Sequence, residues 1–186
     1  VQNGSLRGKE FAARVLGACG SPERVNEPLI ELYTAEKDIS RVEVLTALAR
    51  LASVEGLSFV KVRISSQDID EAKSALTALA TAKTESAAAE VLALSKSASD
   101  AAKYIQQICG YYRACSSVIN KEHTTALLRL TESKRLSIED RIALLDLLIA
   151  NEKYWPSDAK KTLKQLADTG NMELREAVLV ALALSG

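Results

Sequence analysis

The sequence predicts an all-α fold, a right-handed α-solenoid in which antiparallel helix pairs are stacked side by side. A helix template recurs, with a basic residue seven positions before a leucine; the basic residues are Lys9, Arg41, Arg141 and Arg175. Their separations are close to one or three periods of about 33 residues, which is typical of stacked helical repeats. Apolar residues also recur at helical spacing through most of the chain. We therefore expect one domain over residues 1–186, with about five helical pairs.

The first predicted pair occupies residues 6–35. Its first helix carries an apolar stripe at positions i, i+4 and i+7, formed by Phe11, Val15 and Ala18. A glycine ends this helix, and Ser21 followed by Pro22 supplies an N-cap and a proline at the first position of the second helix. Ser40 and Glu43 then form a capping box that starts a third helix. Two antiparallel helices and a short loop thus make the repeating unit.

Residues 57–67 depart from this pattern. The segment LSFVKVRI, residues 57–64, is rich in β-branched and aromatic residues and alternates weakly, which on propensity alone indicates a short strand. A single strand has no partner in a helical array. We therefore expect an irregular connector over 57–67, and we expect Phe59 to be a second contact site for a partner, because irregular segments commonly carry function.

The helix expected over residues 99–119 is the longest and the most aromatic. Its core face is predicted from residues that recur at spacings of three and four: Ala101, Ile105, Ile108, Tyr112, Cys115 and Ile119. Tyr104, Gln107 and Tyr111 fall on an adjacent face. Because tyrosine combines an apolar ring with a polar tip and is enriched in interfaces, we predict that these three residues bind a partner, with Arg113 at the rim. Packing of the tyrosines in the core is the alternative interpretation.

The last part of the chain returns to the template. Four more helices are expected, the second of them capped by Ser137, over residues 123–133, 137–150, 156–169 and 172–184. The run AVLVALAL at residues 177–184 is apolar on every side, whereas a terminal repeat normally has a polar outer face. Since the chain also begins with Val1, we expect a fragment of a longer protein, with its terminal faces covered by further chain or by a partner.

Composition disfavours several classes of protein. Lys plus Arg and Asp plus Glu both number 24, so the net charge is zero and a basic nucleic-acid binder is disfavoured. No apolar stretch is long enough for a membrane span, and no secretory signal opens the sequence. The three cysteines are odd in number and lie in apolar helical patterns, which favours a reducing, cytoplasmic location over a disulfide framework.

No familiar catalytic site is visible in the sequence. His123 is the single histidine, and the motifs of zinc sites, serine hydrolases and nucleotide-binding loops do not occur. Cys109 and Cys115 lie in apolar patterns, where a thiol is normally structural. We therefore predict a non-catalytic protein with no metal site and no cofactor.

Residues 5–55 and 122–186 resemble HEAT-type helical repeats. The segments that carry the resemblance are SPERVNEPLIELYTAEKDISRVEVLTALARLAS and, near the end of the chain, LKQLADTGNMELREAVLVAL. Residues 57–119 match the pattern poorly. The resemblance implies a HEAT/armadillo-like superhelix in which a turn acid and a helix arginine pair within a repeat, here Asp38 with Arg41 and Asp168 with Arg175.

We predict a protein–protein interaction scaffold that offers a rigid solenoid face to a partner protein or peptide. The alternative is a HEAT-like enzyme or enzyme subunit, similar to bilin lyases or DNA glycosylases, or a nucleic-acid-binding repeat protein. A basic edge near the end of the chain belongs to this alternative; it comprises Arg129, Lys134, Arg135, Lys160, Lys161 and Lys164.

Overall fold

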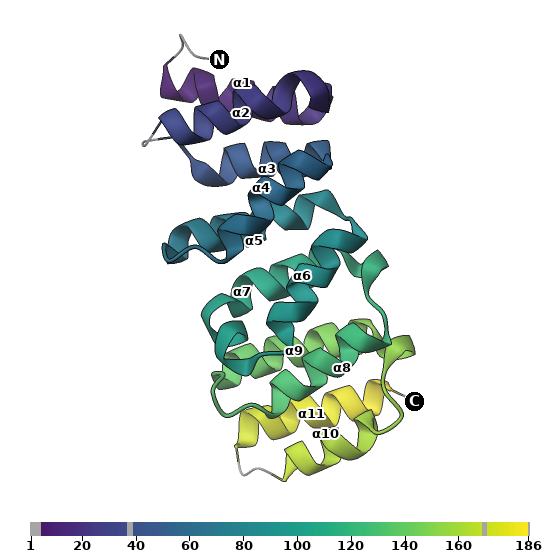
Figure 1. Cartoon of the computed structure of the whole chain (residues 1–186). Coiled ribbons are helices and arrows are strands. Elements are labelled where there is room, and N and C mark those ends of the chain that lie inside the picture. Colours follow the sequence, from purple (N-terminus) through teal and green to yellow (C-terminus); the bar gives the residue numbers. More distant parts are fainter. Residues whose placement is uncertain (1–4, 37–38, 169–170, 186) are drawn as a thin grey trace. The chain divides into compact units, whose positions relative to one another are not determined.

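The computed structural model describes residues 5–36, 39–168 and 171–185 (Figure 1). Within these residues the chain forms helices and no strand, which confirms the all-α prediction. The earlier helices are α1 (Leu6–Cys19), α2 (Pro22–Ala35), α3 (Arg41–Leu51), α4 (Val54–Ile64), α5 (Ile69–Ala82) and α6 (Glu85–Ser95). The later ones are α7 (Ala98–Ala114), α8 (Lys121–Glu132), α9 (Ile138–Ala150), α10 (Ala159–Ala167) and α11 (Met172–Leu184), with short 3-10 helices η1 (Ser116–Val118) and η2 (Glu152–Tyr154).

Side-chain caps set several of the helix starts. At α5 the Asp68 carboxylate accepts hydrogen bonds from the amides of Asp70 and Glu71, at 3.0 and 3.2 Å. At α9 the Ser137 hydroxyl accepts one from the amide of Asp140 at 3.1 Å, which confirms the predicted cap. Each bond satisfies a backbone donor that the first helical turn leaves without a partner.

The capping box predicted at Ser40 and Glu43 does not form. The Ser40 side chain makes no capping bond, and its amide donates instead to the Glu10 carboxylate at 3.0 Å. Glu43 forms an ion pair with Arg14, 3.5 Å away. Both replacements come from α1, so contacts between helices take the place of the local motif at this helix start.

The chain divides into two compact units, Val1–Ala88 and Ala89–Gly186, with the boundary inside α6. In the first unit α3 packs between α1 and α5, while α4 contacts α2, α3 and α5. The interior side chains are mainly small or aliphatic, and the bulkiest fully buried ones are Leu29, Leu45, Leu48, Leu76 and Leu79. The first unit is therefore a two-layer helical stack, with α1, α3 and α5 in one layer.

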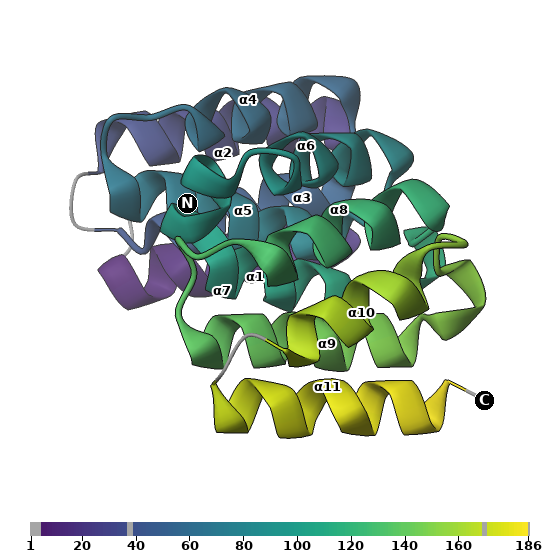
Figure 2. The ribbon, with the colours of Figure 1, turned by 90° about the horizontal axis from the view of Figure 1, so that it is seen from below.

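The second unit repeats this arrangement. Here α9 packs between α7 and α11, α8 packs on α9, and α10 packs on α11; Figure 2 shows α9 and α11 side by side. Its core is the more aromatic of the two, and its bulkiest fully buried side chains include Ile108, Tyr111, Tyr112, Leu127, Leu144 and Leu145. The stacking of helix pairs within each unit is consistent with a solenoid. That one right-handed solenoid runs through both units stays a prediction.

The basic residues of the repeated template have different surroundings. Lys9 is buried and pairs with the Glu36 carboxylate. Arg141 is also buried; its Nε donates to the Thr131 carbonyl oxygen at 2.6 Å, and burial lowers the pKa of its guanidinium. Arg175 is exposed. Equivalent positions in the sequence pattern thus serve different local roles.

The resemblance to HEAT repeats implies that a turn acid pairs with a helix arginine. The described residues do not form such a pair at the two predicted places. Asp38 lies outside the described residues. Arg41 pairs instead with Asp68 of the α5 N-cap, at 2.6 Å. Asp168 and Arg175, both described, make no ion pair with each other; they lie together at one surface depression.

The connector predicted over residues 57–67 is largely wrong, because residues 57–64 lie in α4. The Ser53 hydroxyl accepts a hydrogen bond from the Gly56 amide at 3.0 Å and starts the helix. Leu57, Val60 and Ile64 recur at helical spacing and are buried. Burial of this face against the neighbouring helices outweighs the strand propensity of β-branched residues, a preference that depends strongly on context.

Candidate functional site

Tyr104 and Tyr111, two of the predicted partner-binding residues, lie in the core of the second unit. Their exposed fractions are 8% and 1%. The Tyr111 ring packs edge-on against Tyr112, with ring centroids 5.8 Å apart, and burial raises the pKa of its hydroxyl. The prediction that these tyrosines lie outside the core is therefore wrong, and the alternative interpretation, core packing, is confirmed.

The geometry of α7 explains this difference. The backbone of Tyr104 is not helical (φ −127°, ψ 18°) and kinks α7, which ends at Ala114. The predicted core face is nevertheless confirmed, because all six of its residues are buried: Ala101, Ile105, Ile108, Tyr112, Cys115 and Ile119. Tyr104 and Tyr111 are spaced three or four positions from members of this face, so the buried side of the segment is wider than predicted. Gln107 is half-buried and Arg113 is exposed, so these two predicted contact residues remain accessible.

Phe59 belongs to an aromatic–arginine cluster of the first unit, formed by Tyr33, Phe59, Arg63 and Glu71. The rings of Tyr33 and Phe59 meet edge to face with centroids 5.4 Å apart. The Arg63 guanidinium carbon lies 3.2 Å from the Phe59 centroid and 4.9 Å from that of Tyr33, where cation–π attraction is favourable. Arg63 Nε is 3.6 Å from the Glu71 carboxylate. Phe59 is thus engaged within its own unit, and its contact with a partner stays a prediction.

The carboxylate of Glu71 is the polar centre of this cluster. Burial opposes its ionisation, but hydrogen bonds from Ser66 and Tyr33 and the charges of Arg41 and Arg63 together outweigh burial and hold the pKa of Glu71 below its ordinary value of 4.5. A lowered pKa in the folded state means that the ionised form stabilises the fold. This contribution is fully present above pH 4.5 and is lost as the pH falls through the lowered pKa of the folded state.

Replacing Glu71 by glutamine should remove this part of the acid sensitivity. We expect Glu71→Gln to be less stable than the parent chain near neutral pH and the difference to shrink below pH 4.5, because the parent loses its ionised carboxylate there. Urea unfolding followed by circular dichroism at a series of pH values measures both effects. The exposed Glu27, which has no part in the cluster, supplies the control Glu27→Gln; a constant difference for Glu71→Gln across the series would contradict the prediction.

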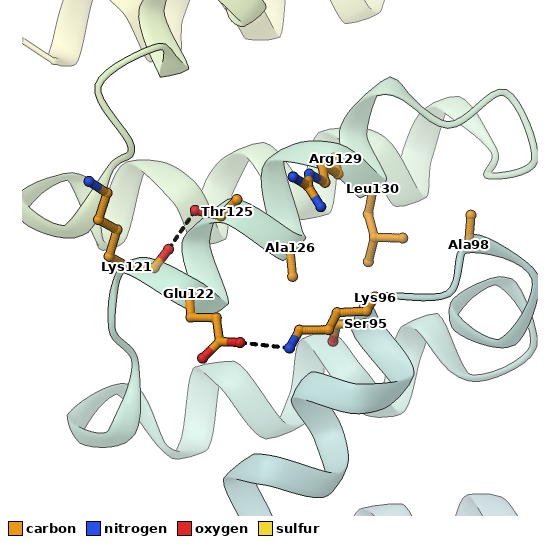
Figure 3. A pocket seen from close by; sticks show the side chains of 9 residues that line it. All are labelled: Ser95, Lys96, Ala98, Lys121, Glu122, Thr125, Ala126, Arg129 and Leu130. Carbon is orange, nitrogen blue, oxygen red and sulfur yellow. Dashed lines mark hydrogen bonds and ion pairs between the residues drawn. The ribbon is translucent and has the colours of Figure 1, made fainter.

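A surface groove of the second unit, called here the α6–α8 groove, has a volume of about 610 Å³. Figure 3 shows its walls. The end of α6 and the start of α7 form one side and α8 forms the other, and the lining residues are Ser95, Lys96, Ala98, Lys121, Glu122, Thr125, Ala126, Arg129 and Leu130.

Local capping positions both walls of the groove. Asn120 starts α8: its side-chain oxygen accepts hydrogen bonds from the amides of Glu122 and His123, at 2.9 and 3.3 Å. Ser97 starts α7 by accepting a bond from the Asp100 amide at 3.4 Å. The two caps fix where α7 and α8 begin, and residues next to both caps line the groove.

The floor of the groove is connected to the aromatic core. Ser95 is buried; its hydroxyl donates to the Val91 carbonyl oxygen at 2.8 Å and lies 3.3 Å from the Tyr112 hydroxyl. Burial raises the pKa of Tyr112 to about 12. The Tyr112 ring also meets the His123 ring edge-on at 5.7 Å. These contacts fix the Ser95 side of the groove before a ligand binds, which reduces the entropy cost of binding.

The rim of the groove is positively charged. Lys96 and Glu122 form an ion pair at 2.6 Å, and the hydrogen bond from Lys96 lowers the pKa of Glu122. Both side chains are more than half exposed, so their pairing contributes little stability. The Lys121 carbonyl oxygen accepts hydrogen bonds from the hydroxyls of Thr124 and Thr125. Among the described residues, neither the Lys121 ammonium nor the Arg129 guanidinium makes an ion pair or a hydrogen bond. Three cations face one carboxylate in this lining, which leaves the groove selective for anionic groups.

Apolar contact is available beside these charges. Ala126 and Leu130 are buried, with 4% and 2% of their surfaces exposed, and lie on α8 one and two turns from Glu122. In Figure 3 the side chains of Ala126 and Leu130 point from α8 toward Lys96, whereas the Lys121 side chain points away from the Lys96–Glu122 pair. Lys96 lies beside these residues but pairs with Glu122, so Arg129 is the cation of the lining that is open to a ligand next to the apolar side chains.

The titratable groups of the second unit do not form a recognisable catalytic set. The His123 ring is buried, with Nδ1 2.8 Å from the Asn120 side-chain oxygen. Burial raises the pKa of the Cys109 thiol to about 11, so the nucleophilic thiolate is scarce at neutral pH. The described residues contain no group of three or more His, Cys, Asp or Glu side chains that could hold a metal ion.

Sequence reasoning identified only Arg129 of the groove residues, as part of the basic edge. Lys96 and Glu122 are 26 positions apart, and only the packing of the α6–α7 turn beside α8 brings them together. The local signal available in the sequence was the pair of caps at Ser97 and Asn120. The remaining basic-edge residues, Lys134, Arg135, Lys160, Lys161 and Lys164, are exposed.

No family model, curated protein or solved structure matches the chain. The resemblance to HEAT-type repeats therefore stays a prediction. Across the described ranges, no helix has both the length and the apolar character needed to cross a membrane.

Proposed function

We propose that the chain is a non-catalytic protein-binding module and that its α6–α8 groove binds an acidic segment of a partner protein. The observation that carries the proposal is Arg129: its guanidinium has no ion pair among the described residues and stands at a groove whose floor is apolar. The ligand class follows from this chemistry, namely a carboxylate next to an aliphatic side chain.

Arginine suits this task better than lysine. Its planar guanidinium binds a carboxylate through two parallel hydrogen bonds, which fix orientation as well as charge. An aliphatic side chain of the same segment would rest on Ala126 and Leu130. Lys121 lies two helical turns before Arg129, about 12 Å along the helix axis, and its flexible side chain can take a second carboxylate of the segment.

The helix stacks of the two units support a scaffold. Each unit holds its helices in two layers around its own apolar core, and such stacks present a large surface without ordering a flexible chain. In this proposal the HEAT-type helix stack supplies a rigid surface, and the α6–α8 groove of the second unit is the specific contact site on it.

The proposal is tested with short synthetic peptides and a charge reversal in the groove. We expect an acetylated EELLEE peptide to bind and Arg129→Glu to weaken binding at least tenfold, about 1.4 kcal/mol, because a carboxylate would then face a carboxylate. Fluorescence anisotropy measures the affinity, and NMR shifts of the Ala126 and Leu130 methyl groups locate the site. Circular dichroism confirms that the variant is folded.

Matched controls separate the groove from the rest of the surface. Arg113→Glu reverses an exposed arginine of α7 outside the groove and should leave binding unchanged. KKLLKK should not bind, and EESSEE should bind more weakly than EELLEE because it lacks the apolar anchor. Equal effects of Arg113→Glu and Arg129→Glu would contradict a specific site, and loss of binding in Arg113→Glu alone would return the site to α7.

The same cations could instead take phosphate groups, and the basic edge continues beyond Arg129 with exposed lysines. The zero net charge of the chain disfavours this alternative. A single-stranded oligonucleotide in the same assay decides between the two: binding that exceeds that of EELLEE and weakens in Arg129→Glu would replace the protein partner by nucleic acid.

A further inference from the structure

Two helices of the chain leave an apolar face uncovered. On α1 the packed side consists of Lys9, Ala13 and Gly17, and the opposite side carries Phe11 and Val15. Phe11 is 65% exposed and Val15 41%. The apolar stripe visible in the sequence of α1 is thus the outward one.

The uncovered face of α11 is similar in character. Its packed side is formed by Leu174, Val178 and Ala181. The outward side carries several large apolar residues with exposed fractions between 49% and 71%: Met172, Leu179, Val180 and Leu184. Exposed apolar side chains that share one helix face are a signature of an interaction surface.

The packing within each unit indicates what kind of element fits these faces. In the first unit α3 is covered on both sides, by α1 and α5, and in the second unit α9 is covered by α7 and α11. By contrast, α1 packs on α3 and α2, and α11 packs on α9 and α10. Each free face therefore lacks the second stacked neighbour that α3 and α9 have. The two helices are also matched in length, with 14 and 13 residues.

The net charges beside the two faces are opposite in sign, because on α11 two exposed glutamates outnumber the exposed Arg175. Arg7 lies next to Phe11 on the exposed side of α1, and Glu173 and Glu176 lie on the exposed side of α11. None of these three side chains makes an ion pair with a described residue. Stacking within the first unit already uses such a contact, because Arg14 of α1 and Glu43 of α3 pair at 3.5 Å. An arginine of α1 facing a glutamate of α11 would repeat it.

We propose that the uncovered face of α11 in one copy of the chain packs on the uncovered face of α1 in a second copy, head to tail. The contact is heterologous, because it joins different surfaces of the two copies. The pair therefore retains one free face of each kind, the α1 face of the first copy and the α11 face of the second, to bind further copies. This self-association is separate from the α6–α8 groove and does not depend on the function proposed for it.

The test uses two variants that each block one face. Phe11→Glu disables the α1 face and Val180→Glu disables the α11 face; both side chains are more than half exposed, so the folded units should be unaffected. A contact made by a single pair of helices is smaller than a standard interface of about 800 Å² per partner. Sedimentation equilibrium is therefore run at concentrations up to the order of 100 µM.

The expected results follow from the head-to-tail geometry. The parent chain should show an average mass that rises with concentration above 20.1 kDa, and each variant alone should associate at least tenfold more weakly. An equimolar mixture of the two variants should form a species of two copies and no larger one, because one intact α11 face meets one intact α1 face. The matched control Val62→Glu, on an exposed position of α4, should behave as the parent.

Three outcomes would overturn the proposal. The parent chain could stay at the mass of one copy throughout the concentration range. Val180→Glu could abolish association while Phe11→Glu leaves it unchanged, which would mean that two α11 faces meet each other. The mixture could also remain at the mass of one copy although both variants are folded by circular dichroism.

Discussion

Replacing Tyr111 by alanine is expected to lower the free energy of unfolding of the second unit by about 3–5 kcal/mol, the range for removing a large buried aromatic side chain. Tyr111 is 1% exposed, its ring packs against Tyr112, and its hydroxyl lies beside the Cys115 thiol. Alanine would leave a cavity that a closely packed interior refills only in part. Urea unfolding followed by circular dichroism measures the change.

Two further variants show whether the ring is responsible. Tyr111→Phe keeps the packing and removes only the hydroxyl, so we expect a loss well below that of the alanine variant. Arg113→Ala changes an exposed neighbour on the same helix and should alter stability by less than about 0.5 kcal/mol. If Tyr111→Ala were as stable as Arg113→Ala, the ring would not be part of the core, and a partner-binding role for Tyr111 would be favoured again.

The second large effect is expected at Gly17, where α1 and α3 approach each other closely. A Cβ atom added at Gly17 would lie 2.5 Å from the Cα of Ala47 and 2.7 Å from its Cβ. The obstacle is backbone, which cannot rotate away as a side-chain tip can. We expect Gly17→Ala to destabilise the first unit by about 1–3 kcal/mol, as overpacking does, even though alanine favours the helical conformation.

Gly110 provides the matched control, because it also lies inside a helix but a Cβ there would meet nothing within 4 Å. Gly110→Ala should therefore stabilise the second unit by about 0.5–1 kcal/mol through helix propensity alone. Thermal and urea unfolding of the two variants measure effects of opposite sign. Stabilisation by Gly17→Ala would show that α1 and α3 can move apart without loss of packing.

Local chemistry made several helices predictable. Residues 22–35 and 172–184 form α2 and α11 with the predicted bounds, because a proline at the first turn in one case and an asparagine cap in the other act within a few residues of the helix start. The Ser137 cap is in the same category. Signals of this kind do not depend on which other helix packs nearby.

The candidate groove could be predicted only in fragments. The sequence identified Arg129 as one of several neighbouring basic residues. It did not show whether Arg129 forms an ion pair, and it did not predict that Arg129 and Lys96 line the same groove. A groove is formed by segments that are distant along the chain, here the end of α6 with the start of α7 on one side and most of α8 on the other. Its charge depends on which acids approach which bases after folding, as Glu122 approaches Lys96.

The sequence by itself determined that the chain is helical, where most helices start, and which helix faces are apolar, since caps and periodicity are properties of adjacent residues. Only the tertiary structure decided how those faces are used. It made residues 57–64 a helix, placed Tyr104 and Tyr111 in the core, and left the Phe11 stripe facing outward. The physical reason is that burial free energy depends on the neighbour that covers a face, and that neighbour is chosen by the packing of the whole unit.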